Sequence, residues 1–315
     1  MLSVSTLICT HSEERWNHLQ QAIDSLRNAQ TRQPDELVVV VDHNSRLLER
    51  VRAQFPEIQV LANQHESGLA GCRNTGVAAA SGEVVAFLDD DAVAAPDWLE
   101  RLIAPFGRDD VVGVGGSVVP AWPSSRPAWF PEAFDWVVGC THSGMPSQPA
   151  PVRNFVGANM AFRRTVLHEL QFFGGIGHAG GKPLGGSDPD ICIRVQQAYP
   201  DQVLLFEPAA RVFHHVTVQR ASWRYFARRC FNEGRAKAML TARLGSDAAL
   251  RSERAYVAST LPRSIQRSWR SAVSRRELRS LAPIPAIVGG LAVTAAGYSS
   301  GLVRQSLARS REPSS

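Results

Sequence analysis

Three consecutive aspartates, Asp89, Asp90 and Asp91, directly follow an apolar run at positions 84–88. Adjacent carboxylates repel one another, so a folded chain keeps them together with the help of a cation or of water. Carboxylate oxygens are hard ligands that suit Mg²⁺ or Mn²⁺, and such ions usually bridge to the phosphates of a substrate. A solvated acidic turn would also explain the triplet, and the neighbouring segments favour the metal site.

The segments before the aspartates predict a sheet that brings polar groups to one edge. Apolar runs at 4–10, 36–41 and 84–88 alternate with helical patterns, which is typical of buried parallel strands in an α/β fold. Open parallel sheets bind ligands beyond the carboxyl ends of their strands. Thr10, Asp42 and the aspartate triplet all fall at such ends, which predicts a doubly wound nucleotide-binding half.

A segment rich in small residues, 68–82, lies between the second and third of these long apolar runs. Its glycines permit close approach of the backbone to a ligand, and exposed N–H groups together with Arg73 suit an anion. A tightly packed helix whose glycines serve only contacts with the sheet is the alternative interpretation, and the segment taken by itself favours that alternative.

The second half of the chain contains a long segment, 121–151, that is rich in Pro, Trp and Ser. Connections of this length are often functional loops. Trp122 and the other aromatic residues there could stack on a sugar, contact a lipid or pin the loop to the core. A glycine-rich run at 173–186 predicts a mobile loop, and Asp188 lies where it could cap the helix that follows.

Composition describes an ordinary globular chain, with 44% hydrophobic and 20% charged residues and a net charge of +5. The five cysteines are scattered and lack metal-ligand spacing, which favours a reduced, cytoplasmic compartment. The first strand begins almost at the first residue, so we expect no signal peptide.

The last third of the chain is rich in arginine and then nearly uncharged over 281–303. That segment is long enough to span a bilayer but only weakly hydrophobic. Arginines on both sides suit an anionic inner leaflet, so we expect a membrane-associated tail, with a single span and a surface-lying helix both open. A packed helix that closes the domain edge is the alternative. Base-reading motifs and zinc spacings do not accompany the arginines, so we expect no nucleic acid partner.

Four segments taken together, Ile8–Thr10, Val41–Ser45, Gly68–Gly76 and Phe87–Asp91, resemble the family 2 glycosyltransferases over about residues 1–235. The resemblance implies an inverting enzyme with the A-type nucleotide-sugar fold, a three-layer α/β sandwich around a mostly parallel sheet. It also implies roles for individual residues in binding the nucleotide sugar. Asp42 would contact the base of the nucleotide, and Asp90 would lie near the ribose. Asp91 would bind the metal together with Asp89. The residues that would line the nucleotide pocket are Thr10, Glu13 and Arg73.

The same resemblance extends into the second half of the chain. It implies that Asn159 faces the transferred sugar and acceptor, that Asp188 is the catalytic base and that His214 completes the metal or diphosphate site. Relatives carry Glu at the position of Ser187, so the contribution of that Glu to acceptor binding is in doubt here. Asp190 matches the second acid of the motif, and we place it with Trp122 among the acceptor-binding candidates. Segments 223–226 and 234–237 resemble a branch that contains glucuronosyltransferases acting on lipid-linked sugars.

These observations predict an inverting, Mn²⁺- or Mg²⁺-dependent transfer from a nucleotide-diphosphate sugar, with a UDP-sugar favoured, to a glycan or lipid-linked acceptor at the cytoplasmic face of the membrane. The acceptor hydroxyl must lose its proton to a base, and the departing diphosphate gains charge that a divalent ion neutralises. A nucleotidyltransferase would need a glycine-rich phosphate loop after the first strand, which residues 10–14 do not supply. A non-catalytic nucleotide-sugar-binding membrane scaffold is the other alternative.

The expected domain organisation has two parts. Residues 1–240 form the catalytic domain, with a nucleotide-binding half at 1–92 and an acceptor half at 93–240. Residues 241–315 form a basic helical tail that contains the weakly hydrophobic segment 281–303.

Overall fold

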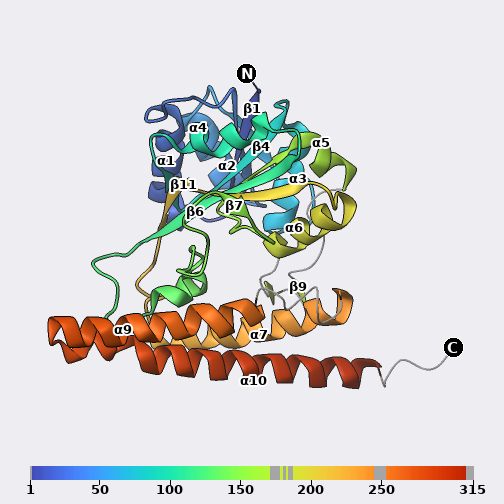
Figure 1. Ribbon diagram of the computed structural model, residues 1–315. Coiled ribbons are helices and arrows are strands. Elements are labelled where there is room, and N and C mark those ends of the chain that lie inside the picture. The colour runs from blue at the N-terminus through green and yellow to red at the C-terminus, as the bar shows by residue number, and fades with distance from the viewer. Residues whose placement is uncertain (1, 171–177, 180–181, 184–186, 245–252, 310–315) are drawn as a thin grey trace. The chain divides into compact units, whose positions relative to one another are not determined.

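The computed structural model describes residues 2–170, 178–179, 182–183, 187–244 and 253–309 (Figure 1). Its contacts divide the chain into two compact units. Unit 1 comprises Met1–Ala121, Pro146–Ile176 and Ser187–His215, and unit 2 comprises Trp122–Met145, Gly177–Gly186 and Val216–Ser315. The predicted boundary at residue 240 falls inside a helix of unit 2, and the extent of the catalytic domain stays a prediction.

Unit 1 is built on a nine-stranded sheet in the part of the chain that the structure describes. Eight of its strands follow the order β3-β2-β1-β4-β8-β6-β11-β5, and β7 pairs with β11. The strands are β1 (Val4–Thr10), β2 (Glu36–Val41), β3 (Gln59–Ala62), β4 (Val84–Asp89), β5 (Ala92–Ala94), β6 (Val111–Ala121), β7 (Ala150–Pro151), β8 (Asn159–Arg163) and β11 (Val203–His215).

The half of the sheet formed by β3, β2, β1 and β4 is entirely parallel, as the apolar runs predicted. Cys9 of β1 lies opposite Val40 of β2 and Asp89 of β4, so the three strands end at one edge. Their side chains are almost all buried because helices cover both faces. The predicted α/β architecture is therefore confirmed.

The other half of the sheet is mixed. Strand β8 runs antiparallel to both neighbours, β4 and β6, while β6 and β11 are parallel. Strand β11 is continuous, with a register shift against β6 between Glu207 and Arg211. The first residue of β11, Val203, lies opposite the first residue of β6, Val111. Near its other end, β11 pairs with β5 in antiparallel fashion.

Helices form a layer on each face of the sheet. Helices α3 (Leu69–Ala79), α5 (Arg164–Glu169) and α6 (Ser187–Ala198) share one hydrophobic cluster with the strand residue Met160. Helices α1 (Trp16–Arg27) and α4 (Trp98–Ile103) contact β5 and β11 respectively. Trp98 of α4 bonds to Asn159, the neighbour of Met160 in β8, which places α4 on the opposite face. Helix α2 (Ser45–Gln54) contacts β2 and β3.

The regular elements among the described residues of unit 2 are helices, apart from the two-residue strands β9 (His178–Ala179) and β10 (Lys182–Pro183). Its helices are η3 (Glu132–Val138), α7 (Trp223–Leu244), η4 (Tyr256–Thr260), α9 (Leu261–Arg275), η5 (Leu278–Leu281) and α10 (Pro283–Arg309). Helices α7 and α10 lie side by side along much of their length (Figure 1). The predicted segment 281–303 falls almost wholly within α10.

An aromatic cluster holds the segment 122–138 against α7. Phe226 of α7 lies 5.6, 5.4 and 5.2 Å, centroid to centroid, from the rings of Trp129, Phe130 and Phe134. The indole of Trp136 donates to the Tyr256 hydroxyl at 3.2 Å, and that hydroxyl donates to the Ala133 carbonyl at 2.6 Å. Of the three interpretations of these aromatic residues, the geometry favours pinning the segment to helices.

Candidate functional site

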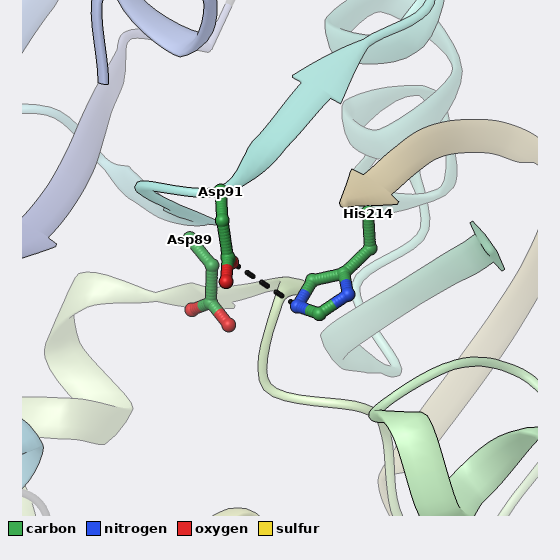
Figure 2. A group of neighbouring side chains, drawn as sticks. All are labelled: Asp89, Asp91 and His214. Carbon is green, nitrogen blue, oxygen red and sulfur yellow. Dashed lines mark ion pairs between the residues drawn. The ribbon is translucent and has the colours of Figure 1, made fainter. Parts of the chain in front are cut away.

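Two carboxylates and an imidazole meet at the carboxyl edge of the sheet in unit 1. Asp89 ends β4, Asp91 lies in the turn before β5, and His214 lies near the end of β11. Their ligand atoms all lie within 4.8 Å of one another. The side chains point toward one another in Figure 2, and His214 Nε2 lies 3.1 Å from Asp91 Oδ1.

Strand pairing explains why residues so far apart in the sequence meet here. In the antiparallel pair of β5 and β11, His214 lies opposite Ala92, the residue that follows Asp91. The His215 amide donates to the Asp91 carbonyl at 2.7 Å and extends this pairing by one step. Backbone hydrogen bonds between β5 and β11 therefore hold Asp91 and His214 next to each other. Both side chains are buried, so the packing around them also limits their movement.

The donor set fits a divalent cation. Carboxylate oxygens are preferred by Mg²⁺ and Mn²⁺, and an imidazole nitrogen is accepted more readily by Mn²⁺ than by Mg²⁺. The carboxylates of Asp89 and Asp91 would supply negative charge, and the buried His214 ring would supply nitrogen. These are the three residues predicted as metal ligands, and the structure brings them together.

Asp90 is buried and has partners from β1 and from the short helix η1 (Glu13–Arg15). Thr10 Oγ1 donates to Asp90 Oδ2 at 2.7 Å, and Arg15 Nη1 donates to Asp90 Oδ1 at 2.6 Å. Arg15 Nη1 also lies 3.2 Å from Asp91 Oδ2. Burial alone would lower the pKa of Arg15, but the charges of Asp90 and Asp91 outweigh it and raise the pKa.

Arg15 is a site residue that the sequence analysis missed. Its position in the polar segment after the first strand was the available signal, because that segment lies at the same sheet edge as the aspartates. The signal was insufficient because nothing in the sequence shows which of the polar residues 10–15 turns toward a triplet about 75 positions later.

Asp42 lies just beyond β2 with a set of local hydrogen-bond donors. Asn63 Nδ2, Ser67 Oγ and the Gly68 amide donate to its carboxylate at 2.7, 2.9 and 2.8 Å. Burial would raise the pKa of Asp42, and these hydrogen bonds outweigh burial and lower it. Gly68 has a φ of 132°, which a residue with a Cβ rarely adopts, so a glycine suits this contact. The carboxylate is held ionised, and its predicted contact with a nucleotide base stays a prediction.

Arg73 of α3 is buried beside the acidic cluster. Its Nη2 donates to the Gly157 carbonyl at 3.0 Å and lies 3.9 Å from Asp89 Oδ1. The helix itself packs tightly, because a Cβ on Gly76 would lie 1.7 Å from Leu7 Cδ2. That glycine therefore serves the contact with the sheet, as the alternative interpretation proposed, while Arg73 brings positive charge to the site.

Two other predicted binding residues, Glu13 and Asn159, have clear structural contacts. Glu13 forms ion pairs with Arg46 and Arg50, at 3.4 and 3.9 Å. Asn159 is fully buried. Its amide nitrogen donates to the Ser117 and Ala210 carbonyls at 2.9 and 2.8 Å. Its amide oxygen accepts from Trp98 Nε1 at 2.8 Å. This geometry assigns Asn159 to the sheet, and its predicted contact with an acceptor stays a prediction without support from this arrangement.

The predicted acid pair of helix α6 is described in part. Asp190 is buried and accepts from Arg194 Nε at 3.1 Å, one turn later. Arg194 also donates to the Leu170 carbonyl at 2.9 Å, which ties the helix to the segment after α5. Asp188 belongs to the first turn of α6, but its side chain lies outside the described residues, as does most of the run 173–186. The base and acceptor roles of this pair stay predictions.

Trp122 belongs to unit 2. Its ring makes an edge contact with Phe130 at 5.1 Å between centroids, and the Arg126 guanidinium lies 5.3 Å from its centroid. Arg126 in turn binds both carboxylate oxygens of Asp135, at 2.5 and 2.8 Å. The predicted acceptor contact of Trp122 stays a prediction.

Comparison with known proteins gives concordant matches. The profile described as glycosyl transferase family 2 matches residues 5–171. A glucosyl-dolichyl phosphate glucuronosyltransferase of Haloferax volcanii is 35% identical over 244 residues, 76% of this chain and 77% of that protein. The succinoglycan biosynthesis protein ExoM of Rhizobium meliloti is 26% identical over 250 residues, 76% of each chain.

The fold has solved counterparts. The crystal structure of GalNAc-T7 with UDP, GalNAc and Mn²⁺ superimposes with a TM-score of 0.52 at 21% identity, over 70% of this chain and 44% of that chain. At that identity the likeness shows the fold, and it agrees with the mixed sheet and helical layers of unit 1.

Proposed function

We propose a function from the premise that this chain belongs to glycosyl transferase family 2 and is a glycosyltransferase. It transfers a sugar, with inversion at the anomeric carbon, from a nucleotide-diphosphate sugar to a hydroxyl of a glycan or lipid-linked acceptor. The reaction depends on Mn²⁺ or Mg²⁺. The enzyme works at the cytoplasmic face of a membrane.

The observation that carries this proposal is the group of Asp89, Asp91 and His214 at the carboxyl edge of the sheet. Such edges are where open α/β sheets bind ligands. When bound there, a divalent cation supplies positive charge beside a departing diphosphate. These three side chains would hold that cation, and the buried environment of Asp91 and His214 would make its electrostatic contribution larger than it would be in water.

Neighbouring side chains set the charge and shape of the pocket. Thr10 and Arg15 orient the buried Asp90, which offers its carboxylate to the ribose of the donor. Arg73, held at the Gly157 carbonyl, contributes positive charge 3.9 Å from Asp89. Asp42, kept ionised by its donors, lies at the end of the neighbouring strand β2 and contacts the base.

Asp188 is proposed as the general base. An acceptor hydroxyl is a poor nucleophile until it loses its proton, and a carboxylate within hydrogen-bond reach of that hydroxyl removes it during attack. Asp188 is the residue that matches the base of the family at the start of α6. Attack from the face opposite the departing diphosphate then inverts the configuration.

Two comparisons support the choice of substrates. The Haloferax relative is named for transfer of glucuronic acid to a glucosyl-dolichyl phosphate, which favours a glycosylated lipid phosphate as acceptor here. The GalNAc-T7 structure holds UDP and Mn²⁺, which favours a UDP-sugar and that cation. Among the described residues one helix, Leu278–Gln305, is long and apolar enough to cross a membrane, judged by length and composition alone, which supports membrane attachment.

The test is a transfer assay with the full chain, Mn²⁺ and a glucosyl polyprenyl phosphate, using UDP-glucuronate, UDP-glucose, UDP-N-acetylglucosamine and GDP-mannose as donors. We expect one UDP-sugar to yield product, and NMR should show that the new linkage has the inverted anomeric configuration. No product should form when EDTA removes the divalent cation. Asp188→Asn should abolish transfer and keep Mn²⁺-dependent UDP binding, whereas the exposed-residue control Asp109→Asn should retain both. Transfer that is unchanged in Asp188→Asn, or a retained configuration, would overturn the assignment.

A further inference from the structure

The solvent-facing side of helix α10 is apolar from Pro285 to Val303, and the exposed Arg304 follows this stretch. The exposed residues of the stretch recur every three or four positions, which places them on one face of the helix. They are Pro285, Val288, Leu291, Ala292, Ala295, Ala296, Ser299, Leu302 and Val303. None of these side chains carries a charge, and Val288 and Val303 are 58% and 59% exposed. A continuous apolar face of this kind marks a docking surface.

The opposite side of α10 packs backbone to backbone against α7. A Cβ on Gly297 would lie 2.1 Å from the Phe231 carbonyl oxygen, and a Cβ on Gly234 would lie 2.0 Å from that of Thr294. Gly301 likewise faces Ala238, at 2.6 Å between the added Cβ and the alanine Cβ. These contacts leave no room for lipid or for larger side chains between the two helices.

Because α7 packs tightly against α10, the α7 residues beside α10 would lie at the same depth in a membrane as α10 itself. Gly290 faces Phe226 and Gly301 faces Ala238, so residues 290–301 run alongside 226–238 in the same direction. This contact is about 20 Å long at 1.5 Å per residue, against about 30 Å for the hydrocarbon core of a bilayer. The facing stretch of α7 contains five charged residues: Arg228, Arg229, Glu233, Arg235 and Lys237.

Crossing the bilayer would therefore carry these charges into hydrocarbon together with α10. Glu233 lies 3.4 Å from both Arg229 and Lys237, but Arg228 is exposed. Charged side chains inside a bilayer are costly and are tolerated mainly when they face a bundle interior or a water-filled cavity. The pairing with α7 thus argues against a span and for a helix that lies along a surface.

Charge complementarity identifies the surface. Residues 261–303 contain six arginines and one glutamate, Glu277. Arg263 and Arg270 are exposed on α9, and the nearby Trp269 is 55% exposed. A second copy of this chain would bring the same positive charge, whereas anionic lipid headgroups complement it. Exposed Trp beside basic residues is typical of a membrane–water interface.

We propose that unit 2 lies in the plane of an anionic lipid bilayer, with the apolar face of α10 inserted to about 5–10 Å at the boundary of headgroups and acyl chains, and that α10 does not cross. This inference deepens the proposed membrane attachment and rests on it, but it does not depend on the proposed chemistry.

The experiment measures depth along α10. Val288→Cys, Ala295→Cys and Val303→Cys variants of the full chain carry an environment-sensitive fluorophore, and the wild-type chain labelled in parallel corrects for the native thiols. Vesicles of phosphatidylcholine and phosphatidylglycerol contain nitroxides at a shallow or a deep acyl position. We expect all three sites to be quenched more strongly by the shallow nitroxide. Stronger deep quenching at Ala295, with shallow quenching at the ends, would show a span and overturn the proposal.

A matched set of substitutions identifies the face and the lipid charge. Val288→Glu and Val303→Glu should each weaken vesicle partitioning at least tenfold, while the control Val218→Glu, at a residue 68% exposed outside α9 and α10, should not. Arg263→Gln and Arg270→Gln should each reduce binding to anionic vesicles about fivefold, the equivalent of about 1 kcal/mol per basic residue. Equal binding to neutral vesicles, or a salt-independent dimer without vesicle binding, would overturn the proposal. Mn²⁺-dependent UDP binding without vesicles reports separately on the proposed chemistry.

Discussion

The two units of this chain distribute charge in opposite ways. In unit 1, carboxylates from β4 and the turn after it gather with an imidazole from β11 within 4.8 Å, and Arg15 and Arg73 lie against them. In unit 2, aromatic rings and glycine contacts fill the interior, while exposed arginines such as Arg263 and Arg270 lie apart along the surface. Concentrated buried charge suits a small, highly charged ligand, whereas dispersed charge suits an extended surface.

The largest effect should come from removing one carboxylate of the concentrated cluster. Asp91→Asn leaves the His214 ring without its anionic neighbour at 3.1 Å and deletes a proposed metal ligand. Mutation of a residue that only hydrogen-bonds to a metal ligand typically lowers metal affinity or activity by about 10- to 100-fold. Loss of a ligand itself should cost more, so we expect kcat to fall by at least about 100-fold. Steady-state assays with saturating donor would measure it. A variant that keeps wild-type kcat and EDTA sensitivity would show that the cluster does not hold the cation.

The next largest effect concerns the interior of unit 2. Gly297→Ala places a Cβ 2.1 Å from the Phe231 carbonyl, and overpacking of this kind costs about 1–3 kcal/mol of unfolding free energy. Gly289→Ala is the matched control, because its Cβ would meet only the Trp223 ring at 3.9 Å. Better helix propensity should stabilise that control by about 0.5–1 kcal/mol. Chemical denaturation of both variants checks this, and equal effects would contradict the close packing of α7 and α10.

A moderate effect is expected from the counter-cation of the cluster. The Arg15 guanidinium lies 3.2 Å from Asp91 and would repel a divalent ion bound there. Arg15→Gln should therefore tighten Mn²⁺ binding in the absence of nucleotide by about tenfold, a change of about 1.4 kcal/mol. Titration calorimetry measures it, with the exposed-residue variant Arg108→Gln as a control. Weaker Mn²⁺ binding in Arg15→Gln would mean that Arg15 positions the carboxylates rather than competing for them.

The smallest effects concern acid stability, and they separate the two units by pH window. Burial lowers the pKa of His142 in unit 2 from 6.5 to about 4, and its Nδ1 accepts from the Gly144 amide. The unfolded chain then binds the extra proton, so this stabilisation is lost as pH falls from about 6.5 to 4. We expect the unfolding free energy to fall by on the order of 1 kcal/mol over this pH range. The fall should be absent in His142→Asn, because the Asn side chain can still accept the hydrogen bond from the Gly144 amide but cannot take up a proton.

Asp42 in unit 1 responds in a lower window. Its pKa lies below the ordinary value of 3.8, so its stabilisation is complete above that pH and is lost only as pH falls through the lowered pKa. Unfolding free energies measured from pH 7 to 3 should show the His142 contribution first. An Asp42→Asn variant that differs from wild type in its slope between pH 6.5 and 5 would contradict this order.

The sequence was most informative where one segment carries the whole signal. The aspartate triplet after an apolar run predicted both the strand β4 and the sheet edge where Asp89 and Asp91 meet His214. Arg15 was missed because Asp90 lies 75 positions later in the sequence, and only strand pairing brings the two together. The donors to Asp42 lie 21 to 26 positions after it, beyond the reach of any local pattern. The three buried partners of Asn159, from Trp98 to Ala210, could not be predicted because long stretches of chain separate them.

The aromatic segment after β6 shows the same limit in unit 2. Its composition left sugar stacking, lipid contact and packing equally open, because ring-bearing residues suit all three. The deciding partner, Phe226, lies about 90 residues later, and no periodicity links it to Phe130 or Phe134. Tertiary packing of this kind is not encoded in local spacing.

The central claim is that Asp89, Asp91 and His214 hold a divalent cation that organises a nucleotide diphosphate. Titration of UDP into the full chain by calorimetry, with and without Mn²⁺, tests it most directly. The account predicts UDP binding that requires Mn²⁺ and that falls at least about tenfold in both Asp91→Asn and His214→Ala, with Asp109→Asn unchanged. UDP binding of equal affinity in EDTA, or Mn²⁺-dependent binding that both variants retain, would contradict it.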